Sequence, residues 1–330
     1  MTHNPNEEEA MLNYDYHKPD TLKEALELMA QYKNEAMYIA GGTDVMVQIE
    51  QRKLKPRALI SLRNVAELKK NDVTTIGSGV THRQLQNNPL IQEHFSALHD
   101  AVCNLGSTQI RNVATIGGNV CTAAPSADTA CPLLVLDAKA VLVSAAGERE
   151  VDIDEFFLGP GKTVLHKGEI LKEFRIRRFT ENTGSAYLKH TRRAAMDLPI
   201  IGIAVRVTLN RNDVKCRDAL CTMEPISKIL GYFEDEELRC EDARIAMGVV
   251  APRPIRAKKA EAALKGKVLS EKLIAEVSEI AASESSPRDS VRGEAWYRRE
   301  MVKVLVKRGI MKAIERVVRP GEAVYPERLW

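Results

Sequence analysis

Two short loops in the sequence place adjacent glycines next to side chains that can form hydrogen bonds. The first is Ile39-Ala40-Gly41-Gly42-Thr43-Asp44, and the second is Thr115-Ile116-Gly117-Gly118-Asn119, which is followed by Thr122, Ser126 and Asp128. Glycine has no Cβ, so backbone N–H groups in such loops can point outward and, with nearby hydroxyls, bind a diphosphate. One glycine pair alone is typical of a tight turn, whereas two pairs of the same form favour a dinucleotide site.

Other motifs that would indicate a particular chemistry are incomplete. Gly77-Ser78-Gly79 begins a G-x-G-x-x-G but lacks the third glycine. Gly161-Lys162-Thr163 ends like a P-loop, although Phe156 occupies the position of the first glycine. The sequence has no C-x-x-C, H-E-x-x-H or nucleophile-elbow motif, and its seven histidines have no metal-ligand spacing. The motifs therefore favour neither a metal centre nor a nucleophilic side chain.

The elements that must position these loops follow an α+β pattern. Thr21 and the glutamate three residues later form a capping box that predicts a helix from about residue 22. Short apolar runs over 37–40, 58–62 and 73–76 predict strands, the first of which leads into the first glycine pair. Thr81 is expected to cap another helix. The pattern lacks the long, regular βαβ units of a doubly wound sheet.

A second region begins near residue 184 and is rich in strands before it becomes helical. The runs 201–209 and 243–250 predict strands, and apolar residues at helical spacing predict helices over the following segments. A final helix is expected around 296–306, with Gly309 as a break before another helical turn. The polar turn residues at 179–184 predict the domain boundary.

Length and composition set the limits of the interpretation. The chain has 330 residues, 44% apolar and 28% charged, with 48 basic and 45 acidic side chains. This predicts two domains, and excludes a disordered or collagen-like chain and a protein built for nucleic acid. No apolar run reaches the roughly 18 residues that a membrane span needs. The acidic start is unlike a secretory signal and six cysteines are too few for a disulfide scaffold, so we expect a cytoplasmic protein.

The segment 109–119, together with AGGTD at 40–44, resembles the FAD-binding subunit of the molybdenum hydroxylases. These are the relatives of xanthine dehydrogenase, carbon monoxide dehydrogenase and hydroxybenzoyl-CoA reductase. The resemblance extends over about residues 14–290, because four further segments agree in order and spacing: FFLGPGKT (156–163), GEIL (168–171), AYLKHTRRAAMD (186–197) and ARIAMGVVAPRPIRAKKAEAAL (243–264). Several separate matches in the same order are specific, whereas any one alone would be weak.

The resemblance implies an α+β fold with two domains. The first, placed at residues 1–181, would be a vanillyl-alcohol-oxidase-type (PCMH-type) FAD-binding domain of two α+β subdomains. The second, placed at 182–290, would be the carbon monoxide dehydrogenase flavoprotein C-terminal domain, a three-stranded sheet with helices. This chain departs from the family by an insertion at about 217–240 and by an extension over 291–330, which we expect to be a docked helix with a basic face.

The resemblance also implies which residues hold FAD. The loop 39–44 and the segment 115–119 would bind the diphosphate through backbone N–H groups, and Thr122, Ser126 and Asp128 would contact the diphosphate or a ribose. Leu105 would lie against the flavin ring, and Leu171 and Lys189 near the adenine or the isoalloxazine. The alternative is ordinary core for both leucines and a solvated surface charge for Lys189. The full set is Ile39, Ala40, Gly41, Gly42, Thr43, Asp44, Leu105, Thr115, Gly117, Gly118, Asn119, Thr122, Ser126, Asp128, Leu171 and Lys189.

In such oxidoreductases this subunit transfers electrons and has no catalytic side chain of its own. A molybdopterin subunit oxidises the substrate, a [2Fe-2S] iron–sulfur subunit relays electrons, and FAD passes them to an acceptor that could be NAD, a quinone or ferredoxin. Two alternatives remain open at this point. One is a self-sufficient FAD-dependent oxidase or dehydrogenase, and the other is a cofactor-free assembly subunit.

Three cysteines near the insertion raise the question of an additional metal site. Cys216, Cys221 and Cys240 could bind zinc or an iron–sulfur cluster, but three ligands are one short of the usual four and none has C-x-x-C spacing. In the hydroxybenzoyl-CoA reductases the extra cluster belongs to an insertion in the N-terminal domain, which this chain lacks. An ordinary surface loop with unpaired thiols is therefore the favoured interpretation.

Overall fold

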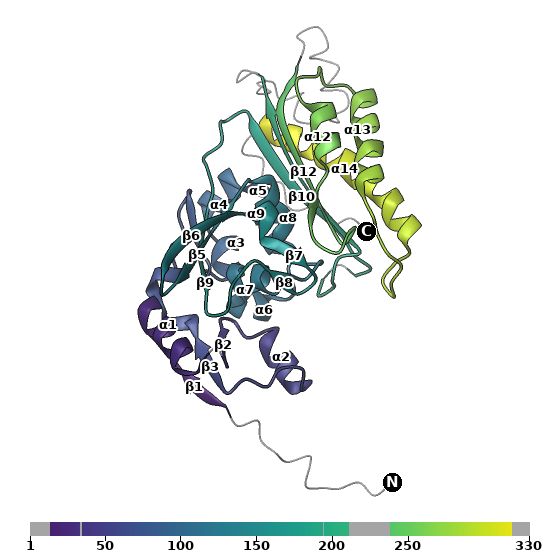
Figure 1. Cartoon of the computed structure of the whole chain (residues 1–330). Coiled ribbons are helices and arrows are strands. Elements are labelled where there is room, and N and C mark those ends of the chain that lie inside the picture. Colours follow the sequence, from purple (N-terminus) through teal and green to yellow (C-terminus); the bar gives the residue numbers. More distant parts are fainter. Residues whose placement is uncertain (1–13, 34, 194, 211–237, 319–330) are drawn as a thin grey trace, which may run out of the picture.

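A computed structural model describes residues 14–33, 35–193, 195–210 and 238–318, which form three connected layers of structure (Figure 1). The insertion at about 217–240 lies mostly outside these residues, and so do Cys216 and Cys221. Cys240 is described; it is buried at the start of a strand, and burial raises the pKa of its thiol to about 12. Among the described residues no group of three potential metal ligands comes together.

The first layer is a small parallel sheet in the order β1 (Asp15–His17), β3 (Ala58–Ser61), β2 (Ala36–Ile39). Helix α1 (Leu22–Gln31) packs on it, and α2 (Val45–Glu50) follows β2. The predicted cap is confirmed, because the Thr21 hydroxyl accepts a hydrogen bond from the N–H of Glu24 at 3.2 Å. The strands predicted over 37–40 and 58–62 are also confirmed within about one residue. Strand β2 of this sheet ends just before the first glycine pair.

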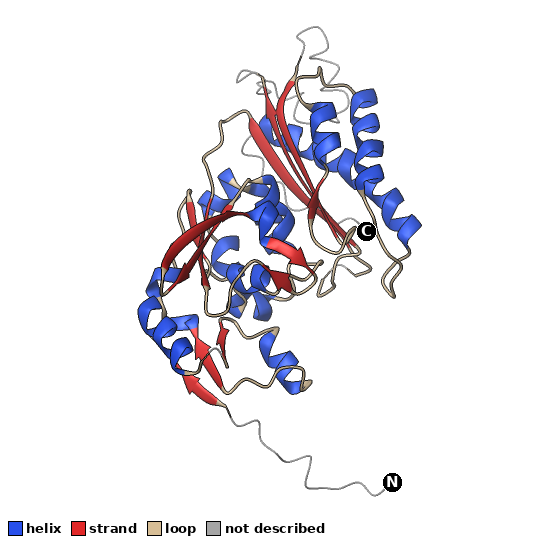
Figure 2. Ribbon diagram, viewed as in Figure 1, coloured by secondary structure: helices blue, strands red, loops and turns tan. Residues whose placement is uncertain are grey.

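The second layer is an antiparallel sheet in the order β4 (Thr75–Gly77), β9 (Ile170–Arg175), β5 (Lys139–Ser144), β6 (Gly147–Asp152). Most of the helices between β4 and β5 in the sequence pack together beside this sheet (Figure 2). Thr81 begins one of them with a complete capping box, as predicted. The remaining elements of the layer are η2 (Leu62–Asn64), η3 (Ala66–Leu68), α3 (His82–Gln86), α4 (Pro89–His94), α5 (Ser96–Asn104), α6 (Thr108–Val113), α7 (Ile116–Cys121), α8 (Ala130–Val135), α9 (Ile153–Phe156), β7 (Phe157–Gly159) and β8 (Lys162–Thr163).

The third layer is an antiparallel sheet in the order β10 (Thr183–His190), β11 (Ile201–Leu209), β12 (Cys240–Gly248), β13 (Ile255–Arg256). The sheet therefore has four strands where three were expected, because β13 adds a two-residue pairing at the edge of β12. Helices α12 (Lys258–Leu264), α13 (Glu271–Glu284) and α14 (Ala295–Val318) pack on one face. The other face contacts α5 and α8 of the second layer. The sheet is thus buried on both sides.

Strand alternation explains how one sheet serves two cores. Leu188 and Val205 belong to the core shared with α14, whereas Tyr187 and Ala204 belong to the core of the second layer. Successive side chains on a strand point to opposite faces, so each strand contributes to both cores in turn. The domain boundaries at residues 181 and 290 remain predictions. The helix expected in the C-terminal extension packs into the same core as this sheet.

Helix α14 is one continuous helix, so the predicted break at Gly309 is wrong. Gly309 is buried against β11, where an added Cβ would lie 2.8 Å from Cγ2 of Val205. The glycine therefore allows a close approach between helix and sheet and does not end the helix, although it lowers helix propensity by about 1 kcal/mol. Within the described part of the chain no helix has the length and apolar character to cross a membrane.

The contact between β10 and α14 can be tested at Gly184, where an added Cβ would overlap the carbonyl oxygen of Ala313. We expect Gly184→Ala to lower the free energy of unfolding by about 2 kcal/mol, because a rigid backbone group must move. In the matched variant Gly159→Ala the added methyl has nothing within 4 Å, and we expect a change below about 0.5 kcal/mol. Urea unfolding measures both; equal stabilities would contradict the described packing.

Candidate functional site

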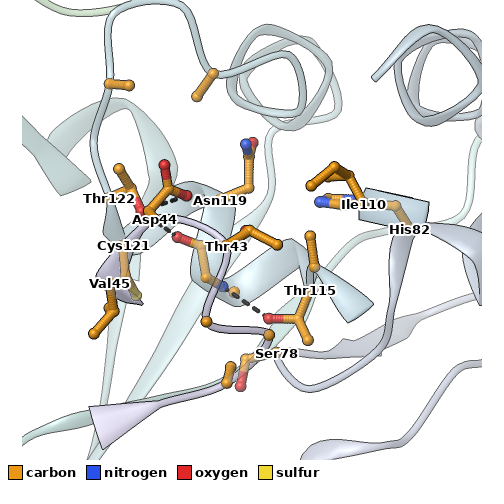
Figure 3. Close-up of a pocket in the computed structure, with 18 of the residues that line it drawn as sticks. Thr43, Asp44, Val45, Ser78, His82, Ile110, Thr115, Asn119, Cys121 and Thr122 are labelled. Atoms are coloured by element: carbon orange, nitrogen blue, oxygen red, sulfur yellow. Dashed lines mark hydrogen bonds between the residues drawn. The ribbon is translucent and has the colours of Figure 1, made fainter. Parts of the chain in front are cut away.

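A cavity of about 750 Å³ lies where the first layer, the second layer and the loop between β10 and β11 meet. This volume is in the range of small-molecule and cofactor pockets. Both glycine pairs line it, and Figure 3 shows Asp44 beside Thr122, whose hydroxyl donates to Oδ2 of Asp44 at 3.5 Å. All residues predicted to bind the cofactor line this cavity except Ile39 and Lys189. The structure thus brings together residues that are more than 120 positions apart in the sequence (44 to 171).

The first glycine of each pair allows three backbone segments to approach closely. A Cβ on Gly41 would overlap the carbonyl oxygen of Val113, and a Cβ on Gly117 would overlap the side chain of Ser78. Gly42 has φ +75°, a conformation that L side chains rarely adopt. These glycines therefore fix the loop 40–44 beside the junction of α6 and α7, and this contact forms the floor of the cavity.

The two loops differ in the hydrogen bonds that their backbones can offer. Among the described residues, the N–H groups of Gly42, Thr43 and Asp44 have no acceptor. In the second loop the N–H of Gly117 donates to Ser78 O at 2.9 Å, and the N–H of Gly118 donates to the Thr115 hydroxyl at 3.0 Å. Outward N–H groups were predicted for both loops, and for the second the prediction is wrong. Its glycines belong to the first turn of α7, which is already capped.

The second loop offers polar side chains to the cavity, and local hydrogen bonds hold them in place. The Thr129 hydroxyl donates to Oδ1 of Asn119 at 2.6 Å, and the Thr122 hydroxyl donates to Gly118 O at 2.9 Å. Both Asn119 and Thr122 line the cavity, and Thr122 lies beside Asp44 of the first loop. A ligand at these loops would therefore meet the backbone N–H groups of the first loop and an amide and a hydroxyl of the second.

Lys189 is neither in the cavity lining nor a solvated charge. Its ammonium donates to Oδ2 of Asp128 at 2.9 Å and to Asn104 O at 3.1 Å, and both charged side chains are only 6% exposed. The Tyr187 hydroxyl donates to the other oxygen of Asp128 at 2.9 Å. Burial raises the pKa of Asp128, while the Lys189 ammonium acts in the opposite direction. Lys189 thus reaches the cavity only through Asp128, which lines it.

The other positions of the predicted set are apolar. Leu105 and Leu171 are buried and also line the cavity. Each can therefore be a core residue and a wall of the site at the same time. Ile39 is buried below Gly42, where it supports the loop from outside the cavity. Whether these residues contact a cofactor remains a prediction.

Several lining residues were missed by the sequence interpretation. Ser78 and Gly79 belong to the G-x-G motif that lacks its third glycine and was therefore not assigned a function. Ser78 O nevertheless accepts a hydrogen bond from the N–H of Gly117. Met196, Asp197 and Leu198 come from the β10–β11 loop. They lie within a segment that carried the family resemblance, but no spacing rule connects them to the glycine loops.

His82 is a further missed residue, and its environment is unusual. It begins α3 and lines the cavity beside Ile110, yet its side chain is fully buried. Neither ring nitrogen has a hydrogen-bond partner within the described residues. Burial lowers the pKa of His82 to about 4, and the nearby charge of Arg111 acts in the same direction. The imidazole is therefore neutral at pH 7, so that the cavity wall carries no positive charge at this point.

Comparison with known proteins identifies two family domains in the chain. A family described as the FAD binding domain in molybdopterin dehydrogenase matches residues 12–177. A family described as the CO dehydrogenase flavoprotein C-terminal domain matches residues 186–313. The two matches together span all three layers of the structure.

Individual relatives agree over nearly the whole chain. A xanthine dehydrogenase FAD-binding subunit of Escherichia coli is 34% identical over 305 residues, 91% of this chain and 95% of its own length. A glyceraldehyde dehydrogenase medium chain of Sulfolobus acidocaldarius is 29% identical over 310 residues, with 92% of this chain and 98% of its own covered. The solved carbon monoxide dehydrogenase from Hydrogenophaga pseudoflava superposes with a TM-score of 0.79 at 28% identity, over 92% of this chain and 98% of that chain.

The burial of His82 predicts a pH dependence of stability. Its pKa is about 4 in the folded chain and about 6.5 in the unfolded chain, so only the unfolded chain takes up a proton as the pH falls through this window. His82 should therefore lower the free energy of unfolding by about 2 kcal/mol between pH 7 and pH 5. Replacement by a residue that does not titrate, His82→Leu, should remove this part of the pH dependence, as urea unfolding at both pH values would measure.

The exposed His94 provides the control for this experiment. His94→Gln should leave the difference between the two pH values as it is in the original chain. If His82→Leu also leaves that difference unchanged, His82 is not buried in a neutral form.

Proposed function

Because the chain belongs to the family of FAD-binding subunits of molybdopterin dehydrogenases, we propose that it is the electron-transfer subunit of a molybdenum-dependent hydroxylase or dehydrogenase. In this role it takes electrons from a [2Fe-2S] iron–sulfur subunit and passes them to an external acceptor. The observation that carries the proposal is the cavity between the two glycine loops, which has the size and the polar groups that a nucleotide cofactor requires. FAD, when bound, supplies the redox chemistry.

We assign the diphosphate of FAD to the space between the glycine loops. The free N–H groups of Gly42, Thr43 and Asp44 would hold it from the first loop, and the side chains of Asn119 and Thr122 from the second. Two features of the chain support this assignment. The missing Cβ atoms of Gly41 and Gly117 let the backbone segments under the cavity pack closely, and no lysine or arginine of the described chain lines it, so neutral donors would bind the anion.

The remaining predicted residues complete the proposed site. Leu105 and Leu171 would contact the flavin or adenine ring as apolar walls, and Ser126 and Asp128 would contact a ribose or the diphosphate. Ile39 and Lys189 act from behind the lining, through Gly42 and Asp128 respectively. Cys121 also lines the cavity, but burial raises the pKa of its thiol to about 12, so it stays protonated and is no nucleophile.

The partners in this proposal are an iron–sulfur subunit and a molybdopterin subunit of one cytoplasmic complex. The names of the related proteins support the type of complex, since they include medium chains and FAD subunits of several dehydrogenases. The acceptor in the proposal is NAD, a quinone or ferredoxin.

Purification of the untagged chain from its host tests this assembly. We expect two further subunits to co-purify, together with iron, sulfide and molybdenum, and we expect the preparation to contain one FAD for each copy of this chain. Metal analysis, flavin absorbance and gel electrophoresis measure these quantities. A lone polypeptide that oxidises a substrate by itself would instead identify a self-sufficient flavin enzyme, and a colourless chain would identify a cofactor-free assembly subunit.

The variant Asn119→Asp tests the proposed diphosphate site with a change of almost no volume. An aspartate oxygen can still accept from the Thr129 hydroxyl, but the variant loses the amide donor and places a negative charge beside the diphosphate. We expect the dissociation constant of FAD to rise at least about tenfold, equivalent to about 1.4 kcal/mol. Flavin fluorescence during rebinding to the deflavinated protein measures it.

The same substitution outside the cavity is the matched control. Asn112 is exposed on α6 and does not line the cavity, so Asn112→Asp should bind FAD as the original chain does. Equal affinities of the two variants would place the diphosphate elsewhere.

A further inference from the structure

The buried pair of Asp128 and Lys189 has an arrangement that packing alone does not explain. Both charges are almost completely removed from water, and three hydrogen bonds fix them: two from Lys189 and Tyr187 to the carboxylate, and one from Lys189 to Asn104 O. Removing an ion pair from water has a desolvation penalty that often equals its attraction, so apolar residues of similar volume would stabilise the same contact as well or better. The pair therefore calls for a role other than stability.

The pair is at the edge of the cavity and is oriented with respect to it. Asp128 lines the cavity and Lys189 does not, so the carboxylate is nearer to the cavity than the ammonium. Asn104, which accepts from Lys189, directly precedes the lining residue Leu105. Tyr187 and Lys189 are two positions apart on β10 and point to the same face of the sheet, toward the FAD-binding layers. The C-terminal sheet thus places a positive charge behind a negative one at the cofactor cavity.

Charges in such a site act strongly on a redox group. A flavin that takes up two electrons and one proton gains one negative charge. Away from water the interaction of that charge with its surroundings is weakly screened, so a net negative wall opposes reduction and a net positive wall favours it. With Lys189 in place the wall is neutral at this point, and loss of either partner would leave a net charge.

We propose that the Asp128–Lys189 pair sets the midpoint potential of the bound FAD, with Lys189 cancelling the effect of the Asp128 carboxylate on the flavin. This inference rests on the proposed function, because it requires FAD in this cavity. It adds to that function a means by which the C-terminal domain, through β10, adjusts how readily the flavin accepts electrons from its partner. Both residues act on the flavin through their charge.

Three variants test the proposal through the sign of the change in potential. Asp128→Asn leaves the ammonium without its counter-charge and should raise the potential. Lys189→Met, titrated at a pH that keeps the Asp128 carboxylate ionised despite its raised pKa, should lower the potential. Each shift should be at least about 30 mV, which for a two-electron couple is a tenfold change in the ratio of reduced to oxidised flavin. The double variant Asp128→Asn/Lys189→Met has no charge at the site and should return close to the original potential. Spectroelectrochemical titration of the flavin absorbance in the purified holoprotein measures all three.

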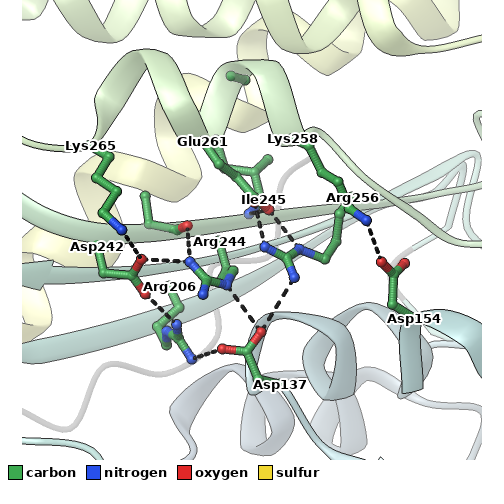
Figure 4. A network of polar contacts seen from close by, with 12 residues as sticks. Asp137, Asp154, Arg206, Asp242, Arg244, Ile245, Arg256, Lys258, Glu261 and Lys265 are labelled. Atoms are coloured by element: carbon green, nitrogen blue, oxygen red, sulfur yellow. Dashed lines mark hydrogen bonds and ion pairs between the residues drawn. The ribbon is translucent and has the colours of Figure 1, made fainter. Parts of the chain in front are cut away.

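A second buried ion pair provides the matched control. In the network of Figure 4, Nε of Arg256 donates to Oε1 of Glu261 at 2.9 Å, and neither residue lines the cavity. The same network joins the layers, because Asp137 after α8 accepts from Arg206 and Arg244, each at 3.0 Å. Glu261→Gln removes a buried carboxylate as Asp128→Asn does, and it should leave the potential unchanged.

The outcomes separate this inference from the proposed function. If the original chain binds no FAD, the proposed function fails. If it binds FAD and the single variants shift the potential in the same direction, or by less than Glu261→Gln does, the charge pair does not set the potential and the inference is overturned. If all three variants lose FAD while the original chain retains it, the pair is required for binding, and the inference is likewise overturned.

Discussion

The close approach of three backbone segments at Gly41 and Gly117 is the constraint on which the site depends. The absence of a Cβ at these two positions lets the loop after β2 lie against the α6–α7 junction, and that junction against the segment around Ser78. A larger residue at either position would force the segments apart, and the cavity would lose its floor. The rest of the second layer, with its sheet and its short capped helices, holds these segments at this separation.

Strand β10 joins the wall of the cavity to the C-terminal part of the molecule. Its alternating residues contribute to two cores, so any shift of the strand by one residue would exchange the core facing α14 with the core facing α5 and α8. The same alternation directs Tyr187 and Lys189 to Asp128. The strand's register is therefore determined by packing on both faces, and this determines the distance of the buried charges from the cavity.

Local signals in the sequence predicted local structure well. The side chains of Thr21 and Thr81 cap helices as their spacing indicated, and the glycine pairs line one cavity. The family resemblance supplied the fold class and FAD, which residue spacing alone left as an unspecified dinucleotide. What could not be predicted depends on contacts between distant segments. The N–H of Gly117 donates to Ser78 O, so it is not free for a ligand, and Gly309 packs against Val205 and does not break its helix. Neither contact could be predicted from the residues next to these glycines in the sequence.

Helix α14 is synthesised after the strands that it covers, and this affects when the cavity can be completed. It begins at Ala295, long after the ribosome has completed β10 at His190, and it covers the face of the sheet opposite the cavity. Domains generally fold as units, the N-terminal one first during synthesis, so the first two layers can form while β10 and β11 still lack their cover. We therefore expect the strand that carries Lys189 to reach its final position only after α14 has been made, so that a nucleotide would enter a finished site after translation.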